Sequence, residues 1–323
     1  MKEVGVIFDK DDKGGGIYTQ LVPDVIKDSF HVETYGLPQP QKRKVAGYTG
    51  LYYKLSKIHG QKDVWIRTSN CIVTLPLDKT RGKNIALFYH IDNSVKPAST
   101  KLFSYVLDRV IVRNLNLVDK IVVLSQYWKE YFEALGHSSI EIIYNPFNLE
   151  EFTFSDDDIE KFKAKYRLSE KPIIYLGNCQ KAKGVVEAYR ALKGLDAHFV
   201  TSGSKNVNLP ALHLNVNYRE YLMLLRASSV AITMSKFKEG WCRTAHEAML
   251  CKTPVVGSGL GGMGELLEGG KQIICPNFSK LRDCVEYAMA ESELGEAGYT
   301  FASQDRFTQE FFKNKWVNLI NDL

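Results

Sequence analysis

The sequence predicts an α/β fold made of two domains, each built on a parallel β-sheet. Short apolar runs rich in β-branched and aromatic residues alternate with segments of helix length, a pattern typical of parallel sheets with helical connections. The alternation occurs in two series that meet near residues 145–170. The chain has 323 residues, enough for about two domains of roughly 100–200 residues each.

The first series covers residues 1–150. Its strand candidates are short apolar runs at residues 4–8, 31–35, 63–67, 85–89, 120–124 and 140–144. A loop at residues 9–16 follows the first strand and ends in three glycines. Residues 99–118 have the apolar spacing of a long helix. His90 directly follows the strand candidate 85–89 (IALFY).

The second series covers residues 151–304, and residues 308–322 form a final predicted helix. Ser155 and the three aspartates after it are typical of a helix cap. The strand candidates lie at 172–176, 197–200, 212–216, 230–234, 254–257 and 272–275, and the helix candidates at 184–192, 218–227, 242–251 and 279–290. Ligands of open α/β sheets bind at the carboxyl ends of the strands, so we expect the functional residues to follow strands.

Composition excludes several classes of protein. With 45% hydrophobic and 24% charged residues, the chain can bury a core and is not disordered. No run of about 18 apolar residues predicts a membrane span, and the first residues lack the apolar core of a signal peptide. The six cysteines have neither CxxC pairing nor His–Cys metal spacing. We therefore expect reduced thiols, a cytoplasmic protein and no bound metal.

The charge is unevenly distributed along the chain. Residues 40–129 contain 16 Lys and Arg against five Asp and Glu, whereas the remainder contains 26 against 32. This basic region indicates an anionic partner, such as a phosphorylated substrate, an anionic lipid surface or nucleic acid. Nucleic acid is disfavoured because no recognised binding motif accompanies the charge.

The strongest functional signal lies in residues 238–270. Glu239 and Glu247 stand eight positions apart, the first in a loop and the second within the helix that follows. A strand and a glycine-rich turn come next, and the backbone N–H groups of residues 260–264 offer an anion site at a helix N-terminus. Gly257, Gly259 and Gly262 also match a dinucleotide fingerprint. That signal is weak, because the following strand ends without an acidic residue.

This region resembles the E-x7-E region of retaining GT-B glycosyltransferases, especially glycosyltransferase family 4. Residues 176–184 are similar to the family's phosphate-binding stretch, with Lys183 and Gly184 at the expected place. Residues 144–152 resemble the segment that ends the first domain, and Gly14 to Gly16 resemble the N-terminal glycine loop. The resemblance covers nearly the whole chain.

The resemblance implies the GT-B fold, with two Rossmann-like domains whose parallel sheets face a central cleft. Residues 1–150 would form the acceptor domain, with the helix at 305–323 packing back on it, and residues 151–304 the donor domain. The implied reaction transfers a sugar from a UDP- or GDP-sugar to a glycan or lipid-phosphate-linked acceptor, with retention and without metal or cofactor. The basic segments 42–58 and 99–118 would contact an anionic membrane surface, making the protein peripheral at the inner membrane face.

The resemblance also implies residue roles. His90, Glu239 and Lys183 form the catalytic set, with Lys183 stabilising charge on the departing diphosphate. Glu239 would hold a sugar hydroxyl and Glu247 the ribose hydroxyls. The remaining donor-binding residues are Gly15, Gly16, Asn178, Gly261, Gly262 and Met263. Purely structural interpretations stay open: Glu247 could pair with Arg243 four residues earlier, and His90 with Asp92 or with backbone.

Asn178 departs from the family pattern, because many members have an arginine immediately after the strand glycine. An amide offers no net charge, so Lys183 or Lys181 would have to supply the missing cation.

Other functions remain as alternatives. Metal-dependent GT-A transferases use a DxD motif, which Asp9 with Asp11 and Asp156 with Asp158 both match. The first pair lies at the start of the chain and the second in a helix cap, so this interpretation is disfavoured. A sugar-nucleotide epimerase, a phosphorylase with the GT-B fold, or a non-catalytic binding module with a degenerate site would share most of the pattern.

Overall fold

The protein, described here by a computed structural model, divides into two compact units. The structure describes residues 1–10, 14–38, 45–92, 94–95 and 98–323. Unit 1 comprises Met1–Pro146 and Gln309–Leu323, and unit 2 comprises Phe147–Thr308. The sequence predicted the corresponding boundaries after residue 150 and before residue 305. Asp11 and the basic residues 42–44 lie outside the described residues.

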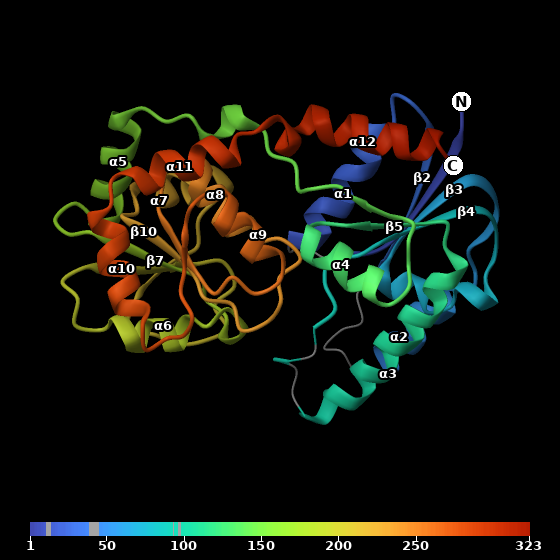
Figure 1. Ribbon diagram of the computed structural model, residues 1–323, viewed down its shortest axis with the longest axis horizontal. Coiled ribbons are helices and arrows are strands. Elements are labelled where there is room, and N and C mark those ends of the chain that lie inside the picture. The colour runs from blue at the N-terminus through green and yellow to red at the C-terminus, as the bar shows by residue number, and fades with distance from the viewer. Residues whose placement is uncertain (11–13, 39–44, 93, 96–97) are drawn as a thin grey trace. The chain divides into compact units, whose positions relative to one another are not determined.

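Unit 1 is a six-stranded parallel sheet with helices on both faces (Figure 1). The strand order is β2-β1-β3-β4-β5-β6, so the direction of strand addition reverses between β1 and β3. Its strands are β1 (Glu3–Lys10), β2 (His31–Pro38), β3 (His59–Thr68), β4 (Lys79–Leu87), β5 (Lys120–Val123) and β6 (Ile140–Ile142). Its helices are α1 (Gly14–Ile26), α2 (Val45–Leu55), α3 (Ala98–Asn114), α4 (Gln126–Ala134) and α12 (Gln309–Asn321).

Helix α12 is the last element of the chain and belongs to the core of unit 1. Phe312 packs edge-on against Tyr18 of α1, with ring centroids 5.1 Å apart. The Tyr18 hydroxyl donates to the Ile143 carbonyl at 3.0 Å, and Lys2 Nζ donates to the Ile320 carbonyl at 2.8 Å. The end of the chain thus closes over a helix near its beginning.

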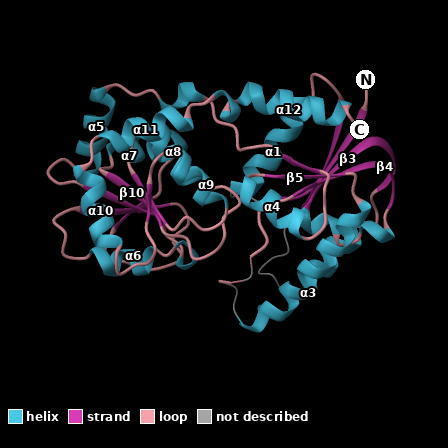
Figure 2. Cartoon of the chain, viewed as in Figure 1, coloured by secondary structure: helices cyan, strands magenta, loops and turns pink. Residues whose placement is uncertain are grey.

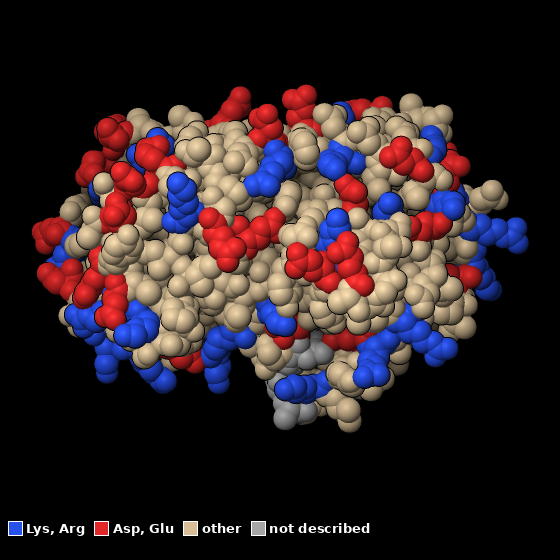
Figure 3. Space-filling model, viewed as in Figure 1, with Lys and Arg blue, Asp and Glu red and all other residues tan. Residues whose placement is uncertain are grey.

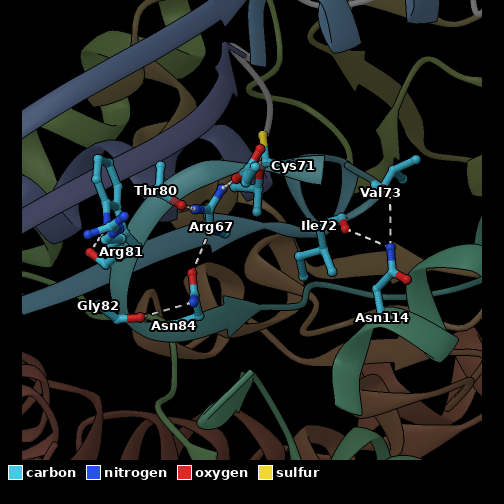
Figure 4. Close-up of polar contacts among 12 residues, drawn as sticks. Arg67, Cys71, Ile72, Val73, Thr80, Arg81, Gly82, Asn84 and Asn114 are labelled. Carbon is cyan, nitrogen blue, oxygen red and sulfur yellow. Dashed lines mark hydrogen bonds and ion pairs between the residues drawn. The ribbon is translucent and has the colours of Figure 1, made fainter. Parts of the chain in front are cut away.

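A buried arginine joins β3 to the segment that leads into β4 (Figure 4). Arg67 Nη1 lies 2.6 Å from Asp78 Oδ2, and both side chains are almost fully buried. Arg67 also donates to Thr80 Oγ1 at 2.7 Å and to Asn84 Oδ1 at 2.8 Å. Burial raises the pKa of the Asp78 carboxyl, against the opposing effect of the Arg67 charge. The pair fixes the carboxyl end of β3 in the interior of the unit.

Unit 2 repeats the plan with the strand order β12-β11-β10-β7-β8-β9, all parallel. Its strands are β7 (Ile173–Asn178), β8 (His198–Ser202), β9 (Leu212–Leu214), β10 (Val230–Thr233), β11 (Val255–Gly257) and β12 (Ile273–Ile274). Its helices are α5 (Asp156–Tyr166), α6 (Val185–Leu192), α7 (Tyr218–Ala227), α8 (Arg243–Leu250), α9 (Gly262–Gly269), α10 (Leu281–Ala290) and α11 (Glu293–Ala302). Helices α7 and α8 cover one face of the sheet and α6 and α10 the other (Figure 2).

Unit 1 differs from the prediction in several elements: α2 and α4 were not predicted as helices, and β4 covers Lys79–Leu87 rather than residues 85–89. The glycine loop is in part a helix, because Gly14 begins α1 and Gly15 and Gly16 lie in its first turn. Tyr18, Val22 and Ile26 recur every four residues and are fully buried, so packing overrides the low helix propensity of glycine. Helix α3 ends at Asn114 rather than at residue 118.

The end of α3 has a visible cause. The Asn114 side-chain amide donates to the carbonyls of Ile72 and Val73, both at 3.0 Å (Figure 4). A short 3-10 turn, Leu115–Leu117, follows.

Candidate functional site

The candidate residues of unit 2 gather where the strand order reverses. Strands β7 and β10 are neighbours in the sheet although they are far apart in the chain, which makes the gap between them the switch point. Lys183 follows β7 and Glu239 follows β10. Such a switch point is where open α/β sheets bind ligands. The topology therefore brings these two predicted residues to one edge of one sheet.

Lys183 and Glu239 are in direct contact. Lys183 Nζ lies 2.5 Å from Glu239 Oε1, and the Ser235 hydroxyl donates to the same oxygen, also at 2.5 Å. The Glu239 side chain is 8% exposed and that of Lys183 is 31% exposed. Burial opposes the charge on Lys183, but the Glu239 carboxylate outweighs it and raises the pKa of the lysine. The two side chains form a partly buried ion pair.

Gly184 explains how Lys183 reaches this position. Lys183 ends a 3-10 turn, Lys181–Lys183, and Gly184 follows it with a φ of +72°. A Cβ atom at Gly184 would lie 2.2 Å from the carbonyl oxygen of Met234 at the end of β10. Only glycine lets the turn after β7 approach β10 this closely.

The glycine-rich turn before α9 holds the backbone of Glu239. The Glu239 N–H donates to the Leu260 carbonyl at 3.1 Å, and the Gly262 N–H donates to the Glu239 carbonyl at 2.9 Å. Gly261 has a φ of +70°, and a Cβ atom there would lie 2.4 Å from the Glu239 carbonyl oxygen. The predicted donor-binding glycines thus position Glu239 through its main chain. The side chain of Met263, predicted at the same site, is fully buried in the core.

Glu247 lies on α8, and its carboxylate accepts hydrogen bonds from three side chains. Tyr218 Oη and Arg243 Nη2 donate to Glu247 Oε1 at 3.2 and 3.1 Å, and Tyr221 Oη donates to Oε2 at 3.0 Å. Glu247 is buried. Burial and the Glu247 charge raise the pKa values of both tyrosines, so they remain hydrogen-bond donors. The pairing with Arg243, which the sequence left open as a structural alternative, is present together with hydrogen bonds from two tyrosines.

Arg243 connects Glu247 to the segment that begins unit 2. Its guanidinium lies over the ring of Phe147, 4.6 Å from the centroid. Phe147 in turn stacks on His246 at 4.1 Å, and its N–H donates to the Phe307 carbonyl at 2.8 Å. The carboxylate of Glu247 is therefore held by a framework that reaches both ends of the unit.

Asn178 ends β7, and its side chain lies against the turn after β8. A Cβ atom at Gly203 would lie 2.7 Å from Asn178 Nδ2. Asn178 Oδ1 is buried without a hydrogen-bond partner among the described residues. The amide is thus at the carboxyl edge of the sheet, as the sequence predicts, but its packing partner is the backbone of Gly203.

The remaining candidates, His90, Gly15 and Gly16, belong to unit 1. His90 is exposed and lies three residues beyond the end of β4, which stops at Leu87 rather than at residue 89. Gly15 and Gly16 follow β1 in the first turn of α1. Each of these residues comes after the carboxyl end of a strand of its own sheet.

Three residues in contact with the candidate carboxylates were not predicted. Tyr218 and Tyr221 stand three positions apart at the start of α7, a spacing that places both on one helix face. Ser235 directly precedes the loop that contains Glu239. In the part of the chain that the structure describes, no group of three or more His, Cys, Asp or Glu residues is placed to hold a metal ion.

Comparison with known proteins extends these observations. Residues 156–297 match the family model described as glycosyl transferases group 1. The chain is 24% identical over 206 residues to the uncharacterized glycosyltransferase MJ1178 of Methanocaldococcus jannaschii. That match covers 58% of this chain and 55% of the relative, so the similarity spans about half the length of that protein.

Solved structures resemble the whole chain. Anabaena Alr3699/HepE in complex with UDP-glucose superposes with a TM-score of 0.76 at 18% identity, covering all of both chains. Sucrose-phosphate synthase from Thermosynechococcus elongatus superposes with a TM-score of 0.79 at 15% identity, covering 100% of this chain and 99% of that one. Among the described residues, no helix has the length and apolar character needed to cross a bilayer. The chain therefore has the GT-B fold with two parallel sheets, and its residues 156–297 are similar to the glycosyl transferases group 1 family.

Proposed function

We propose that this protein is a glycosyltransferase that moves a sugar from a nucleoside-diphosphate sugar, a UDP- or GDP-sugar, to a glycan or lipid-phosphate-linked acceptor. The observation that carries the proposal is the contact between Lys183 and Glu239 at the switch point of unit 2. It joins a cation and a carboxylate at the place where an open α/β sheet binds its ligand. The solved complex of Alr3699/HepE with UDP-glucose supports a nucleotide sugar as the donor.

In this proposal a different side chain of unit 2 contacts each part of the donor: the diphosphate, the sugar and the ribose. The Lys183 ammonium faces the diphosphate and stabilises the charge that develops as the glycosidic bond breaks. The Glu239 carboxylate, fixed through its backbone by Gly261 and Gly262, accepts a hydrogen bond from a sugar hydroxyl. Glu247 accepts hydrogen bonds from the ribose. Unit 1 binds the acceptor, and the reaction proceeds with retention and without a metal or other cofactor.

Donor binding and turnover test the proposal. Thermal unfolding with UDP-, GDP- and ADP-sugars identifies the base, because a ligand that binds the folded state raises its stability. Turnover of the stabilising sugar, labelled in the sugar, is then measured with and without EDTA. The anomeric configuration of the product is read by NMR. No stabilisation by any nucleoside diphosphate or its sugar would contradict the proposal.

Matched lysine variants sharpen this test. Lys181 and Lys183 are two residues apart in the same turn, and Lys183 is the one that contacts Glu239. Lys183→Ala should abolish most of the turnover, whereas Lys181→Ala should leave it near the wild-type rate. Equal losses in the two variants would show that the turn as a whole, rather than Lys183, carries the charge.

We further propose that α3 carries the protein onto an anionic membrane surface. Its solvent-facing half combines apolar and basic side chains. Leu102, Val106 and Val110 are 74%, 53% and 37% exposed. Lys101, Arg109 and Arg113 are exposed beside them, and Figure 3 shows Lys and Arg side chains over this part of unit 1. Apolar residues next to cations suit the interface of an anionic bilayer.

Vesicle co-sedimentation tests this surface. Wild-type protein should bind vesicles that contain phosphatidylglycerol at low salt and should bind pure phosphatidylcholine weakly. Replacing Lys101, Arg109 and Arg113 by Glu should abolish binding, since each basic residue near the surface is worth about 1 kcal/mol. Replacing Leu102 and Val106 by Ser should weaken it without changing the charge. Wild-type protein that ignores anionic vesicles at low salt would contradict the proposal.

A further inference from the structure

Tyr218 is one of three side chains that donate hydrogen bonds to the carboxylate of Glu247. It is the first residue of α7, and its hydroxyl donates to Glu247 Oε1 at 3.2 Å, the longest of the three hydrogen bonds to that carboxylate. Tyr218 is 44% exposed, whereas the Arg243 side chain is 16% exposed. Of the three donors, Tyr218 is therefore the exposed residue, since Tyr221 and Arg243 are partly buried.

The hydrogen-bonding capacity of a carboxylate limits what Glu247 can accept. Two oxygens offer about four acceptor positions, and three are used by Tyr218, Tyr221 and Arg243. A ribose brings two hydroxyl donors. If Glu247 binds both, one of the three protein donors has to yield, and Tyr218 has the longest hydrogen bond and is the exposed residue of the three.

The backbone at Tyr218 is fixed, so only its side chain can move. Asn217 caps α7, and its side chain accepts a hydrogen bond from the Glu220 N–H at 2.9 Å. The Tyr218 ring packs against the ring of Tyr221, with the two centroids 6.1 Å apart. A swing of the side chain about χ1 takes the hydroxyl away from Glu247, whereas rotation about χ2 leaves it in place because the hydroxyl lies on the ring axis.

We propose that Tyr218 is the nucleobase platform of the donor site, and that its hydroxyl exchanges with a ribose hydroxyl at Glu247 when a nucleoside diphosphate binds. The inference rests on the proposed function, because it takes Glu247 as the ribose carboxylate. The base is joined directly to that ribose, so only the sugar ring separates it from Glu247. This places the base close enough for the exposed ring of Tyr218 to stack on it. Every nucleobase has a π-face, so this contact adds affinity for any base.

Calorimetry with UDP, GDP and ADP tests the platform in matched variants. Tyr218→Phe keeps the ring and loses the hydroxyl, and Tyr218→Leu keeps apolar bulk without the ring. Tyr287→Ala is the control, because Tyr287 of α10 is 58% exposed in the same unit. Ribose 5-phosphate, followed by ligand-observed NMR, is the probe without a base.

The variants separate the roles of ring and hydroxyl. Tyr218→Leu and Tyr218→Ala should weaken the best nucleoside diphosphate by about 5- to 150-fold, the range for stacking one base on an aromatic side chain. Tyr218→Phe should bind as tightly as wild type or more tightly, since a competitor for Glu247 is gone. Ribose 5-phosphate should bind all ring variants within about twofold of wild type, and Tyr287→Ala should behave as wild type throughout.

Other outcomes overturn either this inference or the proposed function, and Glu247→Ala distinguishes them. Unchanged nucleotide affinity in Tyr218→Leu, with affinity lost in Glu247→Ala, overturns the platform alone. An equal loss in Tyr218→Phe and Tyr218→Leu assigns the effect to the hydroxyl and also overturns it. Unchanged affinity in Glu247→Ala removes the ribose site on which both proposals rest. Thermal unfolding of each variant confirms that it is folded.

Discussion

Lys183 Nζ and Glu239 Oε1 lie 2.5 Å apart although 56 positions separate the two residues in the chain. The contact joins the loops after two adjacent strands of one sheet. Because the Lys183 ammonium and the Glu239 carboxylate partly neutralise each other, a bound diphosphate would compete with Glu239 for the charge of Lys183.

The pair should contribute to stability as well as to turnover. Lys183→Ala leaves the Glu239 carboxylate buried with one partner fewer, and removing one member of a buried pair costs about 3–5 kcal/mol, less here because Lys183 is partly exposed. Lys183→Ala combined with Glu239→Gln should be more stable than Lys183→Ala alone. Urea unfolding of both singles and the double variant measures the coupling. Strictly additive losses would show that the two side chains do not interact in solution.

A cation at residue 178 should partly replace Lys183. Lys183→Ala should lower turnover by about 3–4 kcal/mol of transition-state stabilisation, similar to the loss of one oxyanion donor. Asn178→Arg should then restore part of the rate, because a guanidinium supplies the charge that an amide lacks. Asn178→Leu is the uncharged control. Failure of Asn178→Arg to rescue turnover would place residue 178 away from the phosphates and leave it as packing for Gly203.

His90 should affect turnover more than nucleotide affinity. It belongs to unit 1, whereas Lys183 and Glu247, which we propose to bind the nucleotide, belong to unit 2. His90→Ala should therefore lower kcat and leave nucleoside-diphosphate affinity by calorimetry nearly unchanged. Equal losses in both quantities would place His90 in nucleotide binding, and wild-type turnover would make it a structural residue.

His246 should make the stability of the protein fall at acidic pH. Trp241 Nε1 donates to His246 Nδ1 at 3.1 Å, so His246 is neutral and donates through Nε2 to the Ala302 carbonyl at 2.9 Å. Burial lowers the pKa of His246 to about 3. The unfolded chain takes up a proton near pH 6.5 and the folded chain does not, so the contribution is complete above that pH and is lost as pH falls toward 3.

The pH effect can be isolated by difference. The free energy of unfolding of wild type minus that of His246→Gln should decrease with falling pH by up to about 1.4 kcal/mol per unit between pH 6 and 4. The surface variant His31→Gln serves as the control. A pH-independent difference would mean that His246 is protonated in the folded protein.

The buried pair of unit 1 should be costly to break. Arg67→Met or Asp78→Leu should each lower the free energy of unfolding by about 3–5 kcal/mol, because the remaining charge is buried without its partner. The double variant should lose less than the sum. The exposed pair of Lys171 and Asp196 gives the comparison, and Lys171→Ala should cost far less, because solvent screens an exposed ion pair. Urea denaturation of the four variants measures these values.

The strands and the position of Lys183 and Glu239 were predictable because their signals are local. A run such as residues 230–232 is apolar and buried in the structure, and the residues after its strand fall at the carboxyl edge of the sheet whatever the loop geometry. The contacts of Glu247 were not predictable in this way. Tyr218 and Tyr221 are 29 and 26 positions away, and only the packing of α7 on α8 brings them to it.

Helix α3 shows a second limit of prediction from sequence, which concerns the burial of its apolar residues. Its apolar positions 102, 106 and 110 and its positions 107 and 111 fit one broad helical stripe, and this spacing alone predicts a single apolar face. In the structure Leu107 and Ile111 are buried, whereas Leu102, Val106 and Val110 face solvent. Periodicity gives the width of an apolar stripe but not which part of it the rest of the fold covers.

The position of α12 has a consequence for how the protein is made. Unit 1 needs Phe312 and the rest of α12 to cover Tyr18, yet the ribosome synthesises all of unit 2 before this helix. Unit 2 can therefore complete its fold while the nascent chain is still growing, whereas unit 1 stays unfinished until residues 309–323 emerge. Premature termination near residue 308 would leave a folded unit 2 attached to an incomplete, aggregation-prone unit 1.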